Sequence, residues 1–120
     1  MRRLLRAKAD LCSSAWCLAE MAAIFQRHIR ERQLAPGPAR ELWGLFEADL
    51  RDEVWNLLPV SESLMRRVAI ATRSLPPDVY LRAGDAIHLV SAREYGFNDI
   101  WTNDRRMLEA APYFGVRGRS

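Results

Sequence analysis

Apolar residues recur every three or four positions over much of the chain, which is the spacing of an amphipathic helix. Between residues 16 and 34, for example, an apolar stripe consists of Trp16, Met21, Ile24, Phe25 and Ile29. Pro36-Gly37-Pro38 interrupts this pattern, Ser61 is placed to cap a later helix, and Gly96 is placed to end another. Spacing and end signals predict helices over residues 2–9, 16–34, 39–52, 61–74, 84–95 and 104–111.

Shorter apolar runs lie between the expected helices and are typical of buried strands. These runs span residues 11–15, 54–60, 100–102 and 114–116. Strands that alternate with helices indicate an α/β fold, in which helices pack on a mainly parallel sheet. We therefore expect one domain over residues 1–120, built as a three-layer α/β sandwich with a mainly parallel sheet.

The composition is that of a soluble globular domain. Apolar residues make up 49% of the chain and charged residues 28%, which argues against a disordered chain. The longest stretch with little charge, residues 11–26, is too short to span a bilayer, and charges soon after the basic start exclude a signal peptide. Cys12 and Cys17 form no CxxC pair. We expect free thiols in a reducing cytoplasm and no membrane partner.

The net charge of +3 is mildly basic, and every basic residue except Lys8 is an arginine. The arginines fall in small groups along the chain, which permits binding to nucleic acid but does not require it. A high arginine content also results from the base composition of a genome. A basic protein that binds nucleic acid without catalysis therefore stays one of the alternatives.

Three acidic residues stand in unusual surroundings, whereas most of the others lie on charged helix faces. Glu20 shares its helix face with apolar side chains, and Asp85 begins an otherwise apolar helix. Asp104 follows the strand 100–102 directly, at the edge where open α/β sheets bind ligands. Buried carboxylates need a proton, a partner or a metal, and converging carboxylates favour Mg²⁺ or Mn²⁺. Such a site is typical of enzymes that hydrolyse phosphodiester bonds.

Each of these carboxylates also has a purely structural interpretation. Glu20 could pair with Arg27 or with another arginine. Asp85 and Asp104 could each cap a helix, with Asn103 as an alternative cap for the last one. The neighbouring His88, one turn after Asp85, could support that carboxylate or be a structural core histidine. Position alone therefore indicates an α/β domain with a candidate metal site.

Three segments carry a resemblance to a known family. Residues 13–20 are Ser-Ser-Ala-Trp-Cys-Leu-Ala-Glu, residues 81–89 are Leu-Arg-Ala-Gly-Asp-Ala-Ile-His-Leu, and residues 100–104 are Ile-Trp-Thr-Asn-Asp. In order and spacing they are similar to the second strand and its helix, the Gly-Asp-Ala helix start and the Thr-Asn-Asp strand end of PIN-domain nucleases. From about Leu4 to Ser120, the chain resembles the small bacterial VapC-type toxins of type II toxin–antitoxin pairs.

The resemblance implies a metal-dependent endoribonuclease that uses Mg²⁺ or Mn²⁺. Carried over to this chain, its catalytic and metal-ligating carboxylates would be Glu20, Asp85 and Asp104. Thr102 and Asn103 would be supporting neighbours that orient the last acid or its water. The implied partners are RNA as substrate, a cognate antitoxin whose tail covers the groove, and a second copy in a homodimer. The implied location is the cytoplasm.

The chain departs from the family's pattern at its start. By the resemblance, PIN domains begin with a central strand that ends in Asp followed by Thr or Ser, and this Asp is a principal metal ligand. Met1 falls in the helix after that strand, so we expect the first, central strand to be missing, through a misplaced start or because this is a fragment. The chain as given should then bind metal weakly and cleave little RNA. The alternative is a catalytically inactive PIN-like fragment that dimerises or binds an antitoxin.

Overall fold

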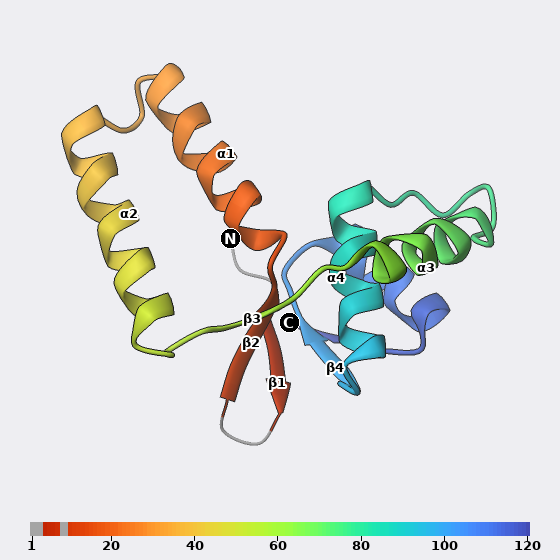
Figure 1. Ribbon diagram of the computed structural model, residues 1–120. Coiled ribbons are helices and arrows are strands. Elements are labelled where there is room, and N and C mark those ends of the chain that lie inside the picture. Colours follow the sequence, from red (N-terminus) through yellow and green to blue (C-terminus); the bar gives the residue numbers. More distant parts are fainter. Residues whose placement is uncertain (1–3, 8–9) are drawn as a thin grey trace.

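The computed structural model describes residues 4–7 and 10–120. Within these residues, five strands form one sheet in the order β3-β2-β1-β4-β5 (Figure 1). The strands are β1 (Leu4–Ala7), β2 (Asp10–Ser14), β3 (Asn56–Leu58), β4 (Asp99–Trp101) and β5 (Arg117–Arg119).

β1 lies at the centre of the sheet and runs antiparallel to both of its neighbours. Leu5 pairs with Cys12 of β2 on one side and with Ile100 of β4 on the other. β2 is parallel to β3, and β4 is parallel to β5, so the described strands other than β1 all point the same way. Their carboxyl ends therefore meet at one edge, as expected of a mainly parallel sheet.

The centre of the sheet differs from what the sequence led us to expect of the first residues. The helix expected over residues 2–9 is wrong for Leu4–Ala7, which form β1, while residues 2, 3, 8 and 9 lie outside the described part. The prediction that the central strand is missing is not confirmed, because β1 fills that position. An isolated helix of this length is marginal, whereas a strand between β2 and β4 satisfies backbone groups of both.

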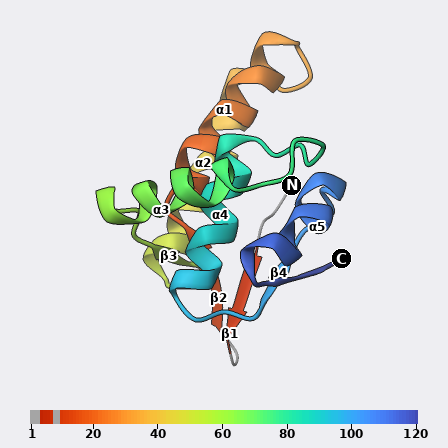
Figure 2. The same ribbon diagram turned by 90° about the vertical axis from the view of Figure 1, so that its right-hand side faces the viewer.

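The helices are α1 (Cys17–Arg30), α2 (Pro36–Arg51), α3 (Glu62–Arg73), α4 (Ala83–Glu94) and α5 (Arg105–Ala110). α4 packs against β2 and β4, and α5 packs against β5. In the turned view of Figure 2, α3 and α4 lie to one side of β1 and α5 to the other. α1 and α2 form a hairpin that extends away from the sheet (Figure 1). The α/β class with parallel strands is thus confirmed, but the three-layer arrangement is not.

Helix ends follow the local chemistry of a few residues. The Ser61 hydroxyl accepts a hydrogen bond from the backbone N–H of Leu64 at 3.1 Å, and Gly96 follows α4 with a φ of 83°. Both predicted end signals are therefore confirmed. α2 begins at Pro36 rather than at Ala39, because a proline in the first turn has no N–H that would go unsatisfied.

The strand expected over residues 114–116 is wrong. A 3₁₀ helix, η1 (Ala111–Phe114), follows α5 without a break. Gly115 then takes a φ of 75°, which turns the chain into β5, so the last strand begins at Arg117.

The core is organised around α4, in which every residue from Asp85 to Ala92 is buried. A helix that is buried all round is expected at the centre of a fold. Ile87 and Leu89 belong to the same apolar cluster as Ile100 of β4. This packing fixes the first turn of α4 beside the carboxyl edge of the sheet. Among the described helices, none has the length and apolar character needed to cross a membrane.

Candidate active site

Polar side chains from separate parts of the chain meet where β2 and β4 end and α4 begins. Ser14 is the last residue of β2, and Thr102 directly follows β4; both are buried. Asp85 lies in the first turn of α4 and is only 1% exposed. The carboxyl edge of the sheet is thus the place where the singled-out residues gather.

Arg82 joins two of the candidate carboxylates. Its Nε donates to Oδ2 of Asp85 at 3.2 Å, and its Nη2 donates to Oδ2 of Asp104 at 3.1 Å. Asp85 and Asp104 lie on different elements, so one guanidinium holds the start of α4 to the end of β4. The hydrogen bond with Asp85 raises the pKa of Arg82 further above its ordinary value, so this cation stays charged.

Asp104 also caps the short helix α5. Its Oδ1 accepts hydrogen bonds from the backbone N–H groups of Arg106 at 2.9 Å and Met107 at 3.4 Å. The backbone N–H of Asp104 in turn donates to Oγ1 of Thr102 at 3.0 Å, so Thr102 does orient this acid's backbone. Asn103 is exposed between them. The capping interpretation is therefore correct for Asp104, but its second oxygen faces Arg82.

Glu20 is held by a buried histidine. Oε1 of Glu20 lies 2.5 Å from Nε2 of His88, and Nδ1 of His88 lies 3.0 Å from Oγ of Ser14. Each ring nitrogen of His88 thus has one hydrogen-bond partner, the carboxylate at Nε2 and the serine hydroxyl at Nδ1. His88 therefore supports Glu20 rather than Asp85, and Glu20 pairs with this ring rather than with Arg27.

Gly84 lets α1 come close to the first turn of α4. A Cβ at this position would lie 2.8 Å from Nε1 of Trp16 and 3.0 Å from Oε2 of Glu20. Only a residue without a side chain permits this approach, so the glycine next to Asp85 brings Glu20 to the same end of α4. Asp85 itself is not the N-cap, since that position belongs to Arg82.

The described residues do not fit a metal site as they are arranged. Within residues 4–7 and 10–120, no group of three or more His, Cys, Asp or Glu side chains is placed to hold a metal ion. The carboxylates themselves are the ligands that Mg²⁺ and Mn²⁺ prefer. Among the described residues, the guanidinium of Arg82 is a cation that contacts both Asp85 and Asp104.

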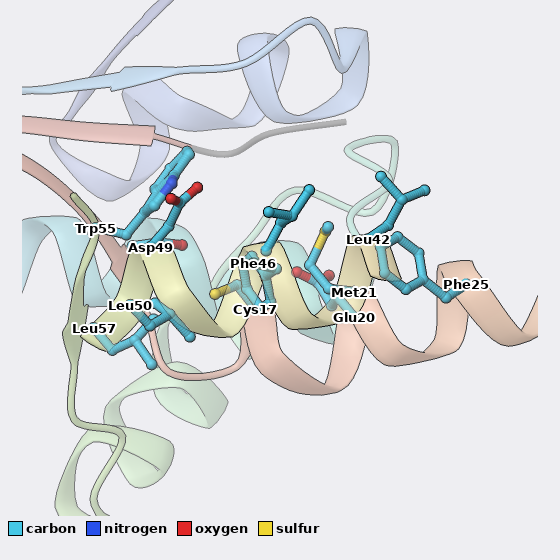
Figure 3. Close-up of a pocket in the computed structure, with 12 residues that line it drawn as sticks. Cys17, Glu20, Met21, Phe25, Leu42, Phe46, Asp49, Leu50, Trp55 and Leu57 are labelled. Carbon is cyan, nitrogen blue, oxygen red and sulfur yellow. The ribbon is translucent and has the colours of Figure 1, made fainter. Parts of the chain in front are cut away.

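An apolar cavity of about 290 Å³ opens between α1 and α2, next to Glu20 (Figure 3). Phe25 of α1 and Leu42 and Phe46 of α2 line it, and Trp55 lies towards its other end. Other lining residues are Ser13, Cys17, Met21, Leu45, Asp49, Leu50 and Leu57. The hairpin that carries Glu20 thus borders an apolar space beside this one of the three candidate carboxylates.

The two cysteines take no part in chemistry at this site. Both are free thiols, as expected, and Cys12 is buried in the sheet. Burial raises the pKa of the Cys17 thiol, so the sulfur stays protonated and is a poor nucleophile at neutral pH.

Sequence reasoning missed two residues of this arrangement. Arg82 precedes Asp85 by one helical turn, and this spacing could have indicated the ion pair. Ser14 is a polar residue at the end of an apolar strand, which was a weaker signal. Its bond to His88 joins positions far apart in the chain and leaves no trace in local spacing.

Comparison with known proteins places the chain in a family. The PIN domain model matches residues 1–112, which is nearly the whole sequence. No curated protein and no solved structure matches the chain. The match covers all of the candidate carboxylates and both helices that carry Glu20 and Asp85. The chain therefore belongs to the PIN domain family, whose members are generally nucleases that depend on divalent metal ions.

Proposed function

We propose that this protein is an endoribonuclease that hydrolyses RNA phosphodiester bonds, and that it is the toxin of a VapC-type toxin–antitoxin pair. The observation that carries the proposal is the meeting of Asp85 and Asp104 at the carboxyl edge of the sheet, with Glu20 at the same end of α4, in a chain of the PIN family. By the family resemblance, catalysis would depend on Mg²⁺ or Mn²⁺; these three acids would become its ligands only after their side chains rearrange from the contacts described above, with Thr102 and Asn103 in support.

An exposed aromatic side chain beside the acids supports RNA as the substrate. Tyr80 is 59% exposed, and the guanidinium of Arg106 lies 4.2 Å from the centre of its ring. The backbone of Arg106 is itself bonded to Asp104, so this pair stands next to the site. Exposed aromatic rings stack on unpaired bases, and arginines bind phosphates, so single-stranded RNA suits this surface.

The cavity between α1 and α2 supports a protein partner. Leu42 and Leu45 on α2 are 45% and 63% exposed, and the cavity beneath them is mostly apolar. Apolar side chains of an antitoxin tail would fill it and end beside Glu20, which would obstruct the site. We place the protein in the cytoplasm, where an antitoxin would meet it, and assign the homodimer on the family resemblance.

Cleavage of RNA by the full chain tests the proposal. Single-stranded RNA of mixed sequence is incubated with protein and Mg²⁺ or Mn²⁺, and products are separated on a gel. We expect Asp85→Asn and Asp104→Asn to lower the cleavage rate at least a hundredfold, because each removes a site carboxylate. Asp78→Asn, an exposed acid on the preceding loop, is the matched control and should keep the rate. Equal cleavage by Asp85→Asn, or in excess EDTA, would contradict the proposal.

A second candidate function is an inactive PIN-like module that binds an antitoxin or a second copy. It is favoured by β1, whose sequence Leu4-Leu5-Arg6-Ala7 contains no carboxylate, and by the arginine between Asp85 and Asp104. A purified chain that cleaves no RNA with any divalent metal but associates with itself or with the protein encoded beside it would favour this function.

A further inference from the structure

Arg82 occupies the position between two carboxylates that a divalent cation would need. Its two contacts come from different nitrogens and reach different acids, at 3.2 Å to Asp85 and 3.1 Å to Asp104. Asp85 is 1% exposed, and the side chain of Asp104 is 21% exposed, so neither acid is fully hydrated. Two such carboxylates repel each other unless a cation lies near both.

The contacts of Arg82 with these two acids are of a kind that another cation can replace. Its side chain is 54% exposed, and it stands at the N-cap position of α4, just before the first helical residue. Arg82 makes one contact to each carboxylate rather than a bidentate pair. Both distances are longer than the 2.7–2.9 Å of strong charged hydrogen bonds. A flexible, half-exposed side chain can leave these contacts without disturbing the packing of α4.

We propose that Arg82 is a built-in counter-ion that competes with divalent metal for the Asp85–Asp104 pair. Without metal, the guanidinium places a positive charge in contact with both acids at the sheet edge. A metal ion that binds there must displace Arg82, because two cations cannot occupy the same space between two carboxylates. The inference concerns the site of the proposed function, but it is tested with metal alone and does not require RNA cleavage.

Removing the guanidinium should therefore strengthen metal binding. Breaking charged contacts to two acids is part of the cost of binding in the natural protein, and Arg82→Gln removes that cost. We expect Mn²⁺ to bind the variant roughly tenfold more tightly, which corresponds to the loss of about one charged hydrogen bond. Binding is measured on the full chain by the loss of the free Mn²⁺ signal in electron paramagnetic resonance.

Arg105→Gln is the matched control. It removes the same charge next to Asp104, and Arg105 is exposed and makes no ion pair with either acid among the described residues. Its Mn²⁺ affinity should stay within about twofold of the natural protein, since an exposed charge is screened. An Arg82→Gln affinity equal to or below that of the natural chain, including no binding at all, overturns the inference.

A second measurement uses the natural protein, in case Arg82→Gln does not fold. The NMR signal of the Nε–H proton of Arg82 is followed while Mg²⁺ is added. The backbone N–H signal of Asp104 is followed in the same titration, as the probe of metal binding at the site. We expect the Arg82 signal to shift or broaden together with that of Asp104. A shifted Asp104 with an unchanged Arg82 signal overturns the inference. Tighter Mn²⁺ binding without RNA cleavage would support the inference and count against the nuclease function.

Discussion

Replacing His88 by leucine measures what the buried contacts around Glu20 contribute to folding. The His88 side chain is 2% exposed, and its ring nitrogens lie 2.5 Å from Oε1 of Glu20 and 3.0 Å from Oγ of Ser14. Leucine has a similar volume, so the substitution removes both hydrogen bonds without opening a large cavity. The change in stability then reports mainly on the polar contacts.

The two partners differ in what they lose. Ser14 is fully buried, so a hydroxyl without its imidazole partner costs about 1–3 kcal/mol. The side chain of Glu20 is 20% exposed and can turn towards water, so its loss costs about 1 kcal/mol. We therefore expect His88→Leu to lower the free energy of unfolding by about 2–4 kcal/mol.

Urea unfolding followed by circular dichroism measures this change, with His28→Leu on α1 as the control. His28 is only partly buried, so its replacement should change stability by less than about 0.5 kcal/mol. The sharper test adds Ser14→Ala. In the His88→Leu protein, this second change removes the unpaired hydroxyl and should recover about 1 kcal/mol, although Ser14→Ala alone destabilises. If the changes that His88→Leu and Ser14→Ala cause in the free energy of unfolding simply add in the double variant, the argument is refuted.

Two further predictions concern a close approach and an exposed ion pair. Gly84→Ala should destabilise the fold by about 1–2 kcal/mol, because the added Cβ would press on Trp16. Gly44→Ala, in the open middle of α2, should instead stabilise the fold by up to about 1 kcal/mol. Thermal unfolding shows whether the two substitutions change the free energy of unfolding in opposite directions. The hydrogen bond from Arg117, at 2.9 Å, lowers the pKa of Asp99 in the folded protein. The ion pair therefore stabilises the fold at pH values above the pKa of Asp99 in the unfolded chain, about 3.9. This stabilisation is lost as the pH falls through the lower pKa of Asp99 in the folded protein. Arg117→Gln should raise the Asp99 pKa in an NMR titration, and an unchanged value would contradict this cause.

Local signals in the sequence predicted the parts of the fold that depend on local chemistry. The cap at Ser61 and the end of α4 at Gly96 follow from single residues, and the structure has both. β1 could not be predicted in this way. Leu4–Ala7 form a strand because β2 and β4 lie on either side, and β4 comes from the far end of the chain. The orientation of the α1–α2 hairpin likewise depends on packing rather than on periodicity.

In the candidate site, too, some residues could be predicted from local sequence signals, whereas their contacts depend on the fold. Asp85 and Asp104 were identifiable because an acid on an apolar helix or at a strand end is unusual. What each acid contacts was not identifiable. Glu20 meets His88, and His88 meets Ser14, through contacts between distant segments. Arg82 was the exception, since it stands one turn before Asp85, and only the second contact to Asp104 required the fold.

The antiparallel β1 also has a consequence for the order in which the chain folds. Its pairing with β2 is a local hairpin, whereas its pairing with β4 joins the two ends of the sequence. Local hairpins close in microseconds, but contacts between distant segments carry a much larger loop-closure cost and slow folding. The two halves of the sheet, β3-β2 and β4-β5, are joined through β1, so the continuous sheet edge that carries Ser14 and Thr102 is complete only at this late step. Arg82 and Asp104, by contrast, are only 22 residues apart on elements that pack directly on each other, so their ion pair does not depend on that step.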